Sequence, residues 1–143
     1  MKVFAGDNFK PAADASYRNL LWENFHVDHS FNIGTKIQEN KEIGTIDSWG
    51  PFFRVSFDLI IHSLHPSNRW TSLLAFRGNG AVCNNCEYGD MVPAIFIDNL
   101  VSKIQISNNG AHLHDFVLFE IELNRWYNII IEQKSPREQV LRL

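Results

Sequence analysis

Apolar and polar residues alternate with a period of two along most of the chain after about residue 44. The clearest run places Phe53, Val55, Phe57, Leu59 and Ile61 on one face. Successive side chains of a β-strand point to opposite faces, whereas the faces of a helix repeat every ~3.6 residues. Almost no stretch repeats at the helical period. The sequence therefore predicts an all-β protein in which the residues from Phe53 to Ile61 face a core.

Further runs have the length and composition of strands, namely residues 70–76, 94–97, 101–107, 117–123 and 126–133. In these runs Phe119, Ile121, Ile129 and Ile131 are expected to share the core with Phe57. Turn residues separate the runs, and strands at this spacing without intervening helices predict an antiparallel β-sandwich. The strands 53–61 and 70–76 follow one another directly, so we expect them to pair.

The chain divides into three parts. Residues 1–40 are irregular and contribute the first strand or strands, residues 41–134 form the sandwich core, and residues 135–143 form a polar tail. Within the first part, Ser16 to Phe25 fits either one or two helical turns or a strand, and Phe31 to Ile37 predicts an early strand. The tail is short and charged, so no strand is expected there.

Size and charge restrict the classes of partner. At 143 residues the chain has the length of one domain, and its net charge of -3 offers no basic surface for nucleic acid. No stretch approaches the ~20 apolar residues of a membrane-spanning helix. Residues 1–24 lack the apolar region of a secretory signal. The sequence as written predicts a soluble cytoplasmic protein, and an extracellular one if it is part of a longer secreted chain.

Residues 43–51 and 53–59, together with residues 123–133, carry a resemblance to a known family. They resemble laminin-G-like domains of the concanavalin A-like jelly-roll superfamily, in which a Trp such as Trp126 opens a strand of alternating apolar residues. Residues 89–96 are similar to the strand that follows the variable loop in that group. The resemblance implies a concanavalin A-like jelly roll. Because such sandwiches commonly run to about 200 residues, it also implies an incomplete C-terminus, an exposed strand edge and self-association.

The same resemblance implies a non-enzymatic binding module whose ligand is a carbohydrate. A protein–protein adhesion module that binds an extracellular protein is the alternative, and a jelly-roll glycoside hydrolase is a third function. The expected site lies in the loops at one rim of the sandwich. Its candidate ligand-binding residues are Trp70, Asn79, Asn84, Asn85, Tyr88, Asp90, Asn108, His112 and His114.

No cofactor is required, and calcium is the one that the resemblance suggests. Laminin-G-like domains hold calcium at the rim with oxygen ligands, which here implies Asp90, Asp98 and Asn99. The alternative is that these residues cap loops. His112 and His114 lack the spacing of a specific metal site and are expected to be loop residues.

Three other features have structural alternatives. Cys83 and Cys86 form a loop-stapling disulfide in an oxidising compartment or remain free thiols, and no second pair of cysteines completes a zinc site. Glu120 and Glu122 stand two apart on one predicted strand, as catalytic carboxylates can, but a solvent-facing pair is the alternative. All four Trp residues are expected to pack, and Trp70, which opens a strand after a turn, is the one that is also a candidate ligand-binding residue.

Overall fold

The computed structural model describes residues 2–6, 11–23, 28–31, 35–47, 52–78, 93–107, 117–135 and 138–142. In these residues the chain forms strands and no helix, which confirms the all-β prediction. The strands are β1 (Lys2–Ala5), β2 (Asp14–Glu23), β3 (Asp28–Phe31), β4 (Thr35–Lys36), β5 (Lys41–Thr45), β6 (Phe53–Ser63), β7 (Trp70–Arg77), β8 (Ala94–Asp98), β9 (Lys103–Ser107), β10 (Val117–Glu120), β11 (Trp126–Ser135) and β12 (Glu138–Arg142). Across this part of the chain, no helix is long and apolar enough to span a membrane.

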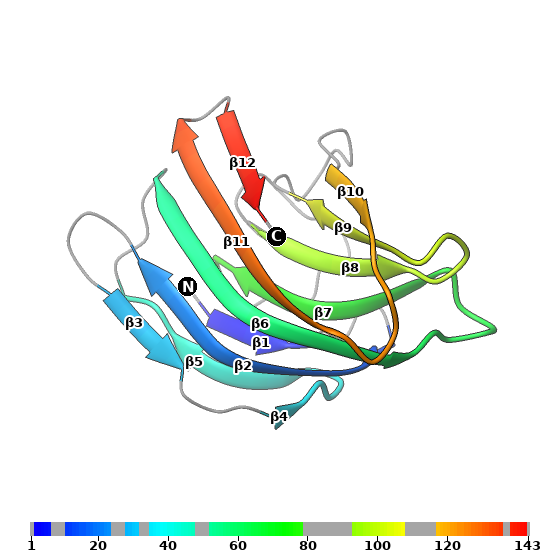
Figure 1. Ribbon diagram of the computed structural model, residues 1–143. Coiled ribbons are helices and arrows are strands. Elements are labelled where there is room, and N and C mark those ends of the chain that lie inside the picture. Colours follow the sequence, from blue (N-terminus) through cyan, green and yellow to red (C-terminus); the bar gives the residue numbers. More distant parts are fainter. Residues whose placement is uncertain are drawn as a thin grey trace.

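The strands form two antiparallel six-stranded sheets. The first has the order β10-β9-β8-β7-β1-β5, and the second has the order β12-β11-β6-β2-β3, with β4 also paired to β2. In Figure 1 the second sheet, with β11, β6 and β2, lies in front of β7 and β8 of the first. The protein is therefore an antiparallel β-sandwich, as the sequence predicts.

The core lies between the two sheets. Phe53, Val55, Phe57, Leu59 and Ile61 of β6 are all buried, so the predicted register of this strand is confirmed. The other apolar residues predicted for this core also belong to it. Ile121, Ile129 and Ile131 are buried in the same cluster as Phe57, and the half-buried Phe119 packs against that cluster. Trp22 adds the largest side chain and stacks on Phe53, with 4.7 Å between the ring centroids.

The predicted pairing of the strands 53–61 and 70–76 is wrong. β6 pairs with β2 and β11 in one sheet, whereas β7 pairs with β1 and β8 in the other. Residues 64–69 therefore carry the chain between the sheets instead of closing a hairpin. β7 is a central strand buried on both faces, and β6 buries only one. Adjacency in the sequence could not distinguish these two environments.

The two ends of the chain contain more strands than expected. Residues 16–23 belong to β2, so the strand alternative holds over that range. The predicted strand 31–37 is represented by the end of β3 and by β4, with residues 32–34 outside the described residues. The expectation of no strand in the tail is wrong, because β12 pairs with β11. Strand pairing uses main-chain N–H and C=O groups, and a segment with charged side chains has these groups as well. Self-association stays a prediction.

Candidate functional site

Most of the predicted rim site lies outside the described residues. This applies to Asn79, Asn84, Asn85, Tyr88, Asp90, Asn108, His112 and His114, and to the cysteines Cys83 and Cys86. Trp49 also lies there, so its predicted packing is not addressed. The structure describes Trp70, Asp98 and Asn99.

Asp98 and Asn99 hold a turn between β8 and β9. The Asp98 carboxylate, which is buried, accepts hydrogen bonds from Arg69 Nε at 3.1 Å and from the Leu100 main-chain N–H at 3.0 Å. Asn99 Nδ2 donates to the Asn68 carbonyl at 2.8 Å. These contacts agree with the loop-capping alternative for both residues. In the described part of the chain, no group of three or more His, Cys, Asp or Glu residues is placed to hold a metal ion.

The remaining described candidates serve separate contacts. Trp70 is half-buried and packs against Ala94 and Phe96. Glu120 forms an ion pair with Lys103 at 3.6 Å and ends β10. Glu122 lies beyond that strand and pairs with Arg125 at 3.1 Å. The sequence suggested that these two carboxylates project side by side from one strand. In the structure they do not, because only Glu120 belongs to β10.

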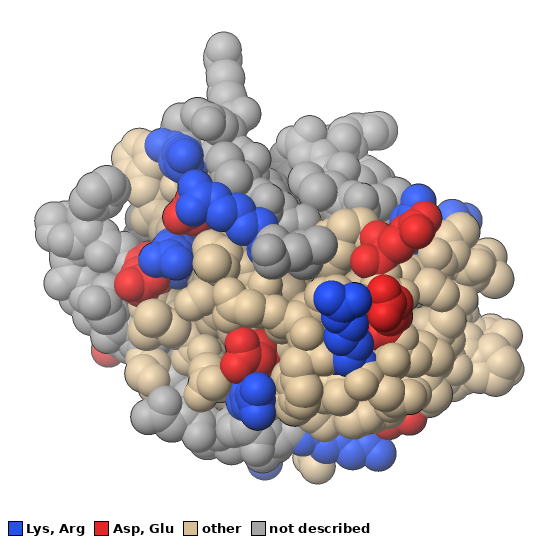
Figure 2. Space-filling model, in the orientation of Figure 1, with Lys and Arg blue, Asp and Glu red and all other residues tan. Residues whose placement is uncertain are grey.

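A different group of side chains gathers on the outer face, which we define as the solvent side of β2, β6 and β11. Along β11, Ile129 and Ile131 point into the core, so the alternate residues Trp126, Asn128 and Glu132 project outward. Trp126 is 42% exposed, which makes the prediction that all four Trp residues pack wrong for this residue. Figure 2 shows this face, where charged side chains of opposite sign lie next to one another.

Asp58 is the centre of a polar network on the outer face. Its carboxylate accepts hydrogen bonds from Asn128 Nδ2 at 2.9 Å, from Asn19 Nδ2 at 2.9 Å and from Arg18 Nε at 3.1 Å. Partial burial of Asp58 opposes its ionisation, but the hydrogen bonds from Asn128, Asn19 and Arg18 and the charge of Arg18 outweigh it. The pKa of Asp58 therefore lies below its ordinary value, and the carboxylate is ionised at neutral pH.

This network fixes the position of Arg18 against Trp126. The Arg18 guanidinium lies over the indole, 4.0 Å from the ring centroid, in cation–π geometry. Asn19 reaches Asp58 because the pairing of β2 with β6 shifts between Arg18 and Leu21, and Asn19 itself has a φ of 54°. Asn tolerates this left-handed conformation better than most residues. A β-bulge thus brings two adjacent residues of β2 to one carboxylate.

The ionised network gives a pH-dependent contribution to stability. Because the folded pKa of Asp58 lies below the ordinary value that it keeps in the unfolded chain, its contribution is full above that ordinary value and is lost as the pH falls through the folded pKa. We expect Asp58→Asn to lower the unfolding free energy by about 1–3 kcal/mol at pH 7. That difference should stay constant down to about pH 5 and shrink below about pH 4. Urea unfolding of both proteins at pH 7, 5 and 3 measures it, and an unchanged difference at pH 3 would contradict this assignment.

A second charged network lies further along the same strands. Arg54 lies between two carboxylates, with Nη1 3.3 Å from Glu23 Oε2 and Nε 3.6 Å from Glu132 Oε1. Arg142 Nη2 adds a contact of 3.1 Å to Glu132 Oε2. The outer face therefore has an aromatic and polar group at one end and an alternating chain of charges toward the other.

Sequence reasoning missed Arg18, Asn19, Asp58, Asn128 and the exposed position of Trp126. One signal was present: the alternation that points Tyr127 and Ile129 inward also places Trp126 and Asn128 on the outside. The partners from β2 had no such signal, because Asn19 and Asp58 are 39 residues apart in the chain. No family model, curated protein or solved structure gives a significant match to this chain.

Proposed function

We propose that the protein is a non-enzymatic carbohydrate-binding module that binds its ligand on the outer face of β2, β6 and β11. We further propose that its β-sandwich is a concanavalin A-like jelly roll of the laminin-G-like kind. The two antiparallel sheets are compatible with this fold class. The site differs from the rim loops that the sequence suggested, since the proposal now rests on side chains that the structure describes.

The exposed Trp126 beside the Asp58 network is the observation that carries the proposal. An indole offers a flat apolar surface, and the C–H faces of sugar rings pack against such surfaces. The indole here is partly solvent-exposed and is held in place by Arg18. A ligand site of this kind combines an aromatic contact surface with a few fixed polar groups, and the network supplies those groups.

The network keeps hydrogen-bonding capacity for a ligand. Asn19 and Asn128 each use Nδ2 on Asp58, and Arg18 uses Nε. Within the described contacts, their amide oxygens and the Arg18 Nη groups have no partner. Amide oxygens accept from hydroxyl groups and the guanidinium donates to them, so the set suits a polyhydroxylated ligand. All three side chains are oriented by Asp58 before any ligand arrives.

Two other functions are retained as alternatives. A protein–protein adhesion module would use the same exposed face without a sugar, and an extracellular location would suit either binding function. A glycoside hydrolase is the weakest alternative, since Glu120 and Glu122 pair with separate cations. A calcium ion bound through Asp98, Asn99 and Asp90 stays a prediction from the sequence, because Asp98 and Asn99 make loop-capping contacts and lie on the other sheet from the proposed face.

A glycan array followed by calorimetry, with and without calcium, tests the proposed function. We expect Trp126→Ala to weaken binding of the best glycan by about 30-fold or more, because a Trp at the centre of a binding site is commonly worth about 2 kcal/mol or more. Trp70→Ala is the matched control at the rim and should leave the affinity unchanged in the folded protein.

The outcomes separate the alternatives. Loss of binding in Trp70→Ala with none in Trp126→Ala would move the site to the rim. An absence of glycan binding in both calcium conditions would overturn the lectin function and favour the adhesion module. Release of reducing ends from polysaccharides, abolished by Glu120→Gln, would establish the hydrolase instead.

A further inference from the structure

Exposed apolar side chains gather at one end of the sandwich. In the described part of the chain, the large apolar side chains that are exposed are Phe52, Leu100, Val101, Leu123 and Trp126. Leu100 and Val101 lie in the turn between β8 and β9, and Leu123 lies in the turn between β10 and β11. In Figure 1 both turns lie on the right-hand side. We call these three aliphatic residues the apolar tip, and a group of this kind is typical of an interaction surface.

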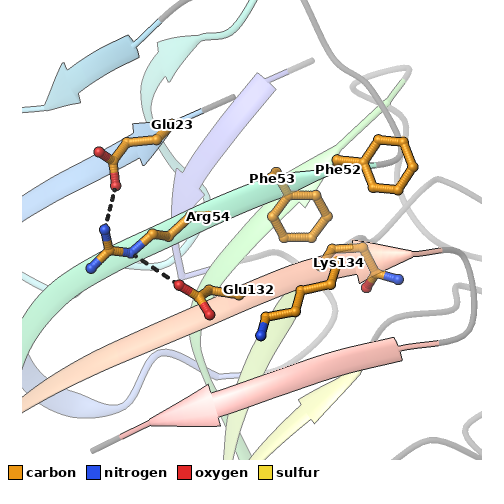
Figure 3. A pocket seen from close by; sticks show the side chains of 7 residues that line it. Glu23, Phe52, Phe53, Arg54, Glu132 and Lys134 are labelled. Atoms are coloured by element: carbon orange, nitrogen blue, oxygen red, sulfur yellow. Dashed lines mark ion pairs between the residues drawn. The ribbon is translucent and has the colours of Figure 1, made fainter. Parts of the chain in front are cut away.

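The far end of the outer face has a different character. Figure 3 shows Arg54 between Glu23 and Glu132, with Phe52 and Lys134 to one side of this group. These residues line a pocket of about 380 Å³ in which the two carboxylates and the two cations balance. Phe52 is 38% exposed and lies among these charges. It is a single apolar side chain, whereas the tip joins three.

Hydrogen bonds join the two turns of the tip and fix their shape. The Ile121 main-chain N–H donates to the Ser102 carbonyl at 3.1 Å, so the connection from β10 to β11 runs beside the β8–β9 turn. The Asn99 N–H donates to the Arg69 carbonyl at 2.7 Å and ties the same turn to the segment before β7. Leu100 is 73% exposed in a turn that is held in this way. The fold therefore holds this side chain outward.

Main-chain donors at both turns are paired within the protein. The Leu100 N–H donates to Asp98 Oδ1 at 3.0 Å, and the Asn124 N–H donates to the Ile61 carbonyl at 2.7 Å. A main-chain N–H group that enters an apolar medium without a partner costs free energy, and these two groups bring their partners with them. The tip can therefore leave water without breaking the hydrogen bonds that shape its turns.

Three ion pairs flank the tip. They are Arg69–Asp98, Lys103–Glu120 and Arg125–Glu122. Each cation is matched by a carboxylate, so the pairs contribute no net charge, and the whole protein has a net charge of -3. An anionic surface would gain nothing from this arrangement, whereas a zwitterionic one matches it.

The small size of the tip favours a lipid surface over a protein partner. A stable protein–protein interface uses roughly 20–30 residues on each side. The tip offers three aliphatic side chains that project from two turns between ion pairs. A bilayer is fluid and admits projecting side chains, and each one that enters it removes apolar surface from water.

From these observations we propose that the apolar tip docks on the surface of a zwitterionic phospholipid bilayer. Leu100, Val101 and Leu123 enter the boundary between headgroups and acyl chains, and the three ion pairs lie at the level of the headgroups. This surface is separate from the outer face that carries Trp126 and the Asp58 network. The inference therefore goes beyond the proposed function and does not depend on it.

Flotation with large unilamellar vesicles of phosphatidylcholine tests the proposal. We expect the protein to float with the vesicles, and its partition coefficient should change by less than about twofold when phosphatidylserine replaces a fifth of the lipid or when the salt is raised from about 0.1 M to about 1 M. Failure to bind phosphatidylcholine, or binding that requires phosphatidylserine, would overturn the proposal.

Variants assign the binding to the tip. Leu100→Gln should lower the partition coefficient at least about tenfold, and the nearly isosteric Val101→Thr should lower it about fivefold, because each loses apolar surface that the bilayer would bury. Phe52→Gln removes an exposed apolar side chain at the far end and is the matched control, which should bind like the parent protein. All three positions are exposed, so urea midpoints close to that of the parent are expected.

Two results would contradict this assignment. The first is a folded Leu100→Gln protein that binds vesicles as tightly as the parent. The second is an oligomer in sedimentation that Leu100→Gln dissociates without loss of vesicle binding, because the tip would then be an interface between copies of this chain. Trp126→Ala is expected to keep vesicle binding, so that failure of the carbohydrate site and failure of the lipid surface are distinguishable.

Discussion

Replacement of Phe57 by Ala is expected to lower the free energy of unfolding by about 3–5 kcal/mol, the usual cost of truncating a buried aromatic side chain. Phe57 is 0% exposed and lies at the centre of β6, opposite Ile129 of β11. Both the lost apolar contacts and the cavity left between the sheets contribute. For a domain whose total stability is of order 5–15 kcal/mol, this is a large fraction.

Urea unfolding monitored by far-ultraviolet circular dichroism measures the effect. Ser56→Ala is the matched control, since Ser56 is adjacent on β6 but projects to the outer face, and it should change the unfolding free energy by about 0.5 kcal/mol or less. Equal midpoints for Phe57→Ala and the parent protein would mean that the opposite face of β6 lies inside.

Gly6→Ala is expected to have the second largest effect, a loss of about 2–4 kcal/mol. Gly6 follows β1 with a φ of 80°, a conformation that side chains rarely adopt. A Cβ atom built at this position would collide with the main-chain oxygen of Gln38. The Gly6 N–H also donates to the Leu73 carbonyl at 2.7 Å, so the main chain is not free to move away.

Asn40→Ala separates the two causes. Asn40 has a φ of 50° but is exposed, so its replacement by Ala reports conformational strain alone, at about 1 kcal/mol. Thermal and urea unfolding measure the loss of unfolding free energy in both variants. The loss for Gly6→Ala minus the loss for Asn40→Ala gives the cost of the collision with Gln38. A melting temperature for Gly6→Ala equal to that of the parent would show that the turn after β1 relaxes without cost.

The fold class and the inward face of the strands could be predicted from local patterns. Alternation is a property of neighbouring residues, so the sequence pattern within β6 and within β11 was enough to predict which of their side chains enter the core. The pairing of strands depends on residues far apart in the chain. β6 has β2 and β11 as partners, and neither is its neighbour in sequence. That information is absent from any single segment, which explains why the expected pair β6–β7 was wrong.

The candidate site shows the same limit at the level of side chains. Arg18, Asp58 and Asn128 are unremarkable polar residues in their own segments, and they become a network only because three strands lie side by side. Asn19 joins them through a bulge that a regular strand pattern would not contain. The loops drew attention because of their polar composition, whereas the strands carried polar residues that composition alone assigns to solvent.

The two proposed locations of the site also differ physically. Loops carry binding residues in many proteins, but side chains on regular strands are held more precisely. On the outer face, Asp58 orients three neighbours through side-chain hydrogen bonds, so little order has to be gained when a ligand binds. Ligand preference on such a face would change through substitutions rather than through loop movement.

The central position of β6 has a consequence for how the chain folds. Its contacts are distant in sequence: Asp14 and Ser63 are 49 residues apart, and Asp58 and Asn128 are 70 apart. Closing such long loops costs entropy before the pairing compensates it, which is why sandwiches of this kind fold more slowly than helical proteins. During synthesis β6 is made well before β11. Its row of apolar side chains therefore lacks this neighbour until β11 is made, and in that interval the nascent protein is most exposed to aggregation.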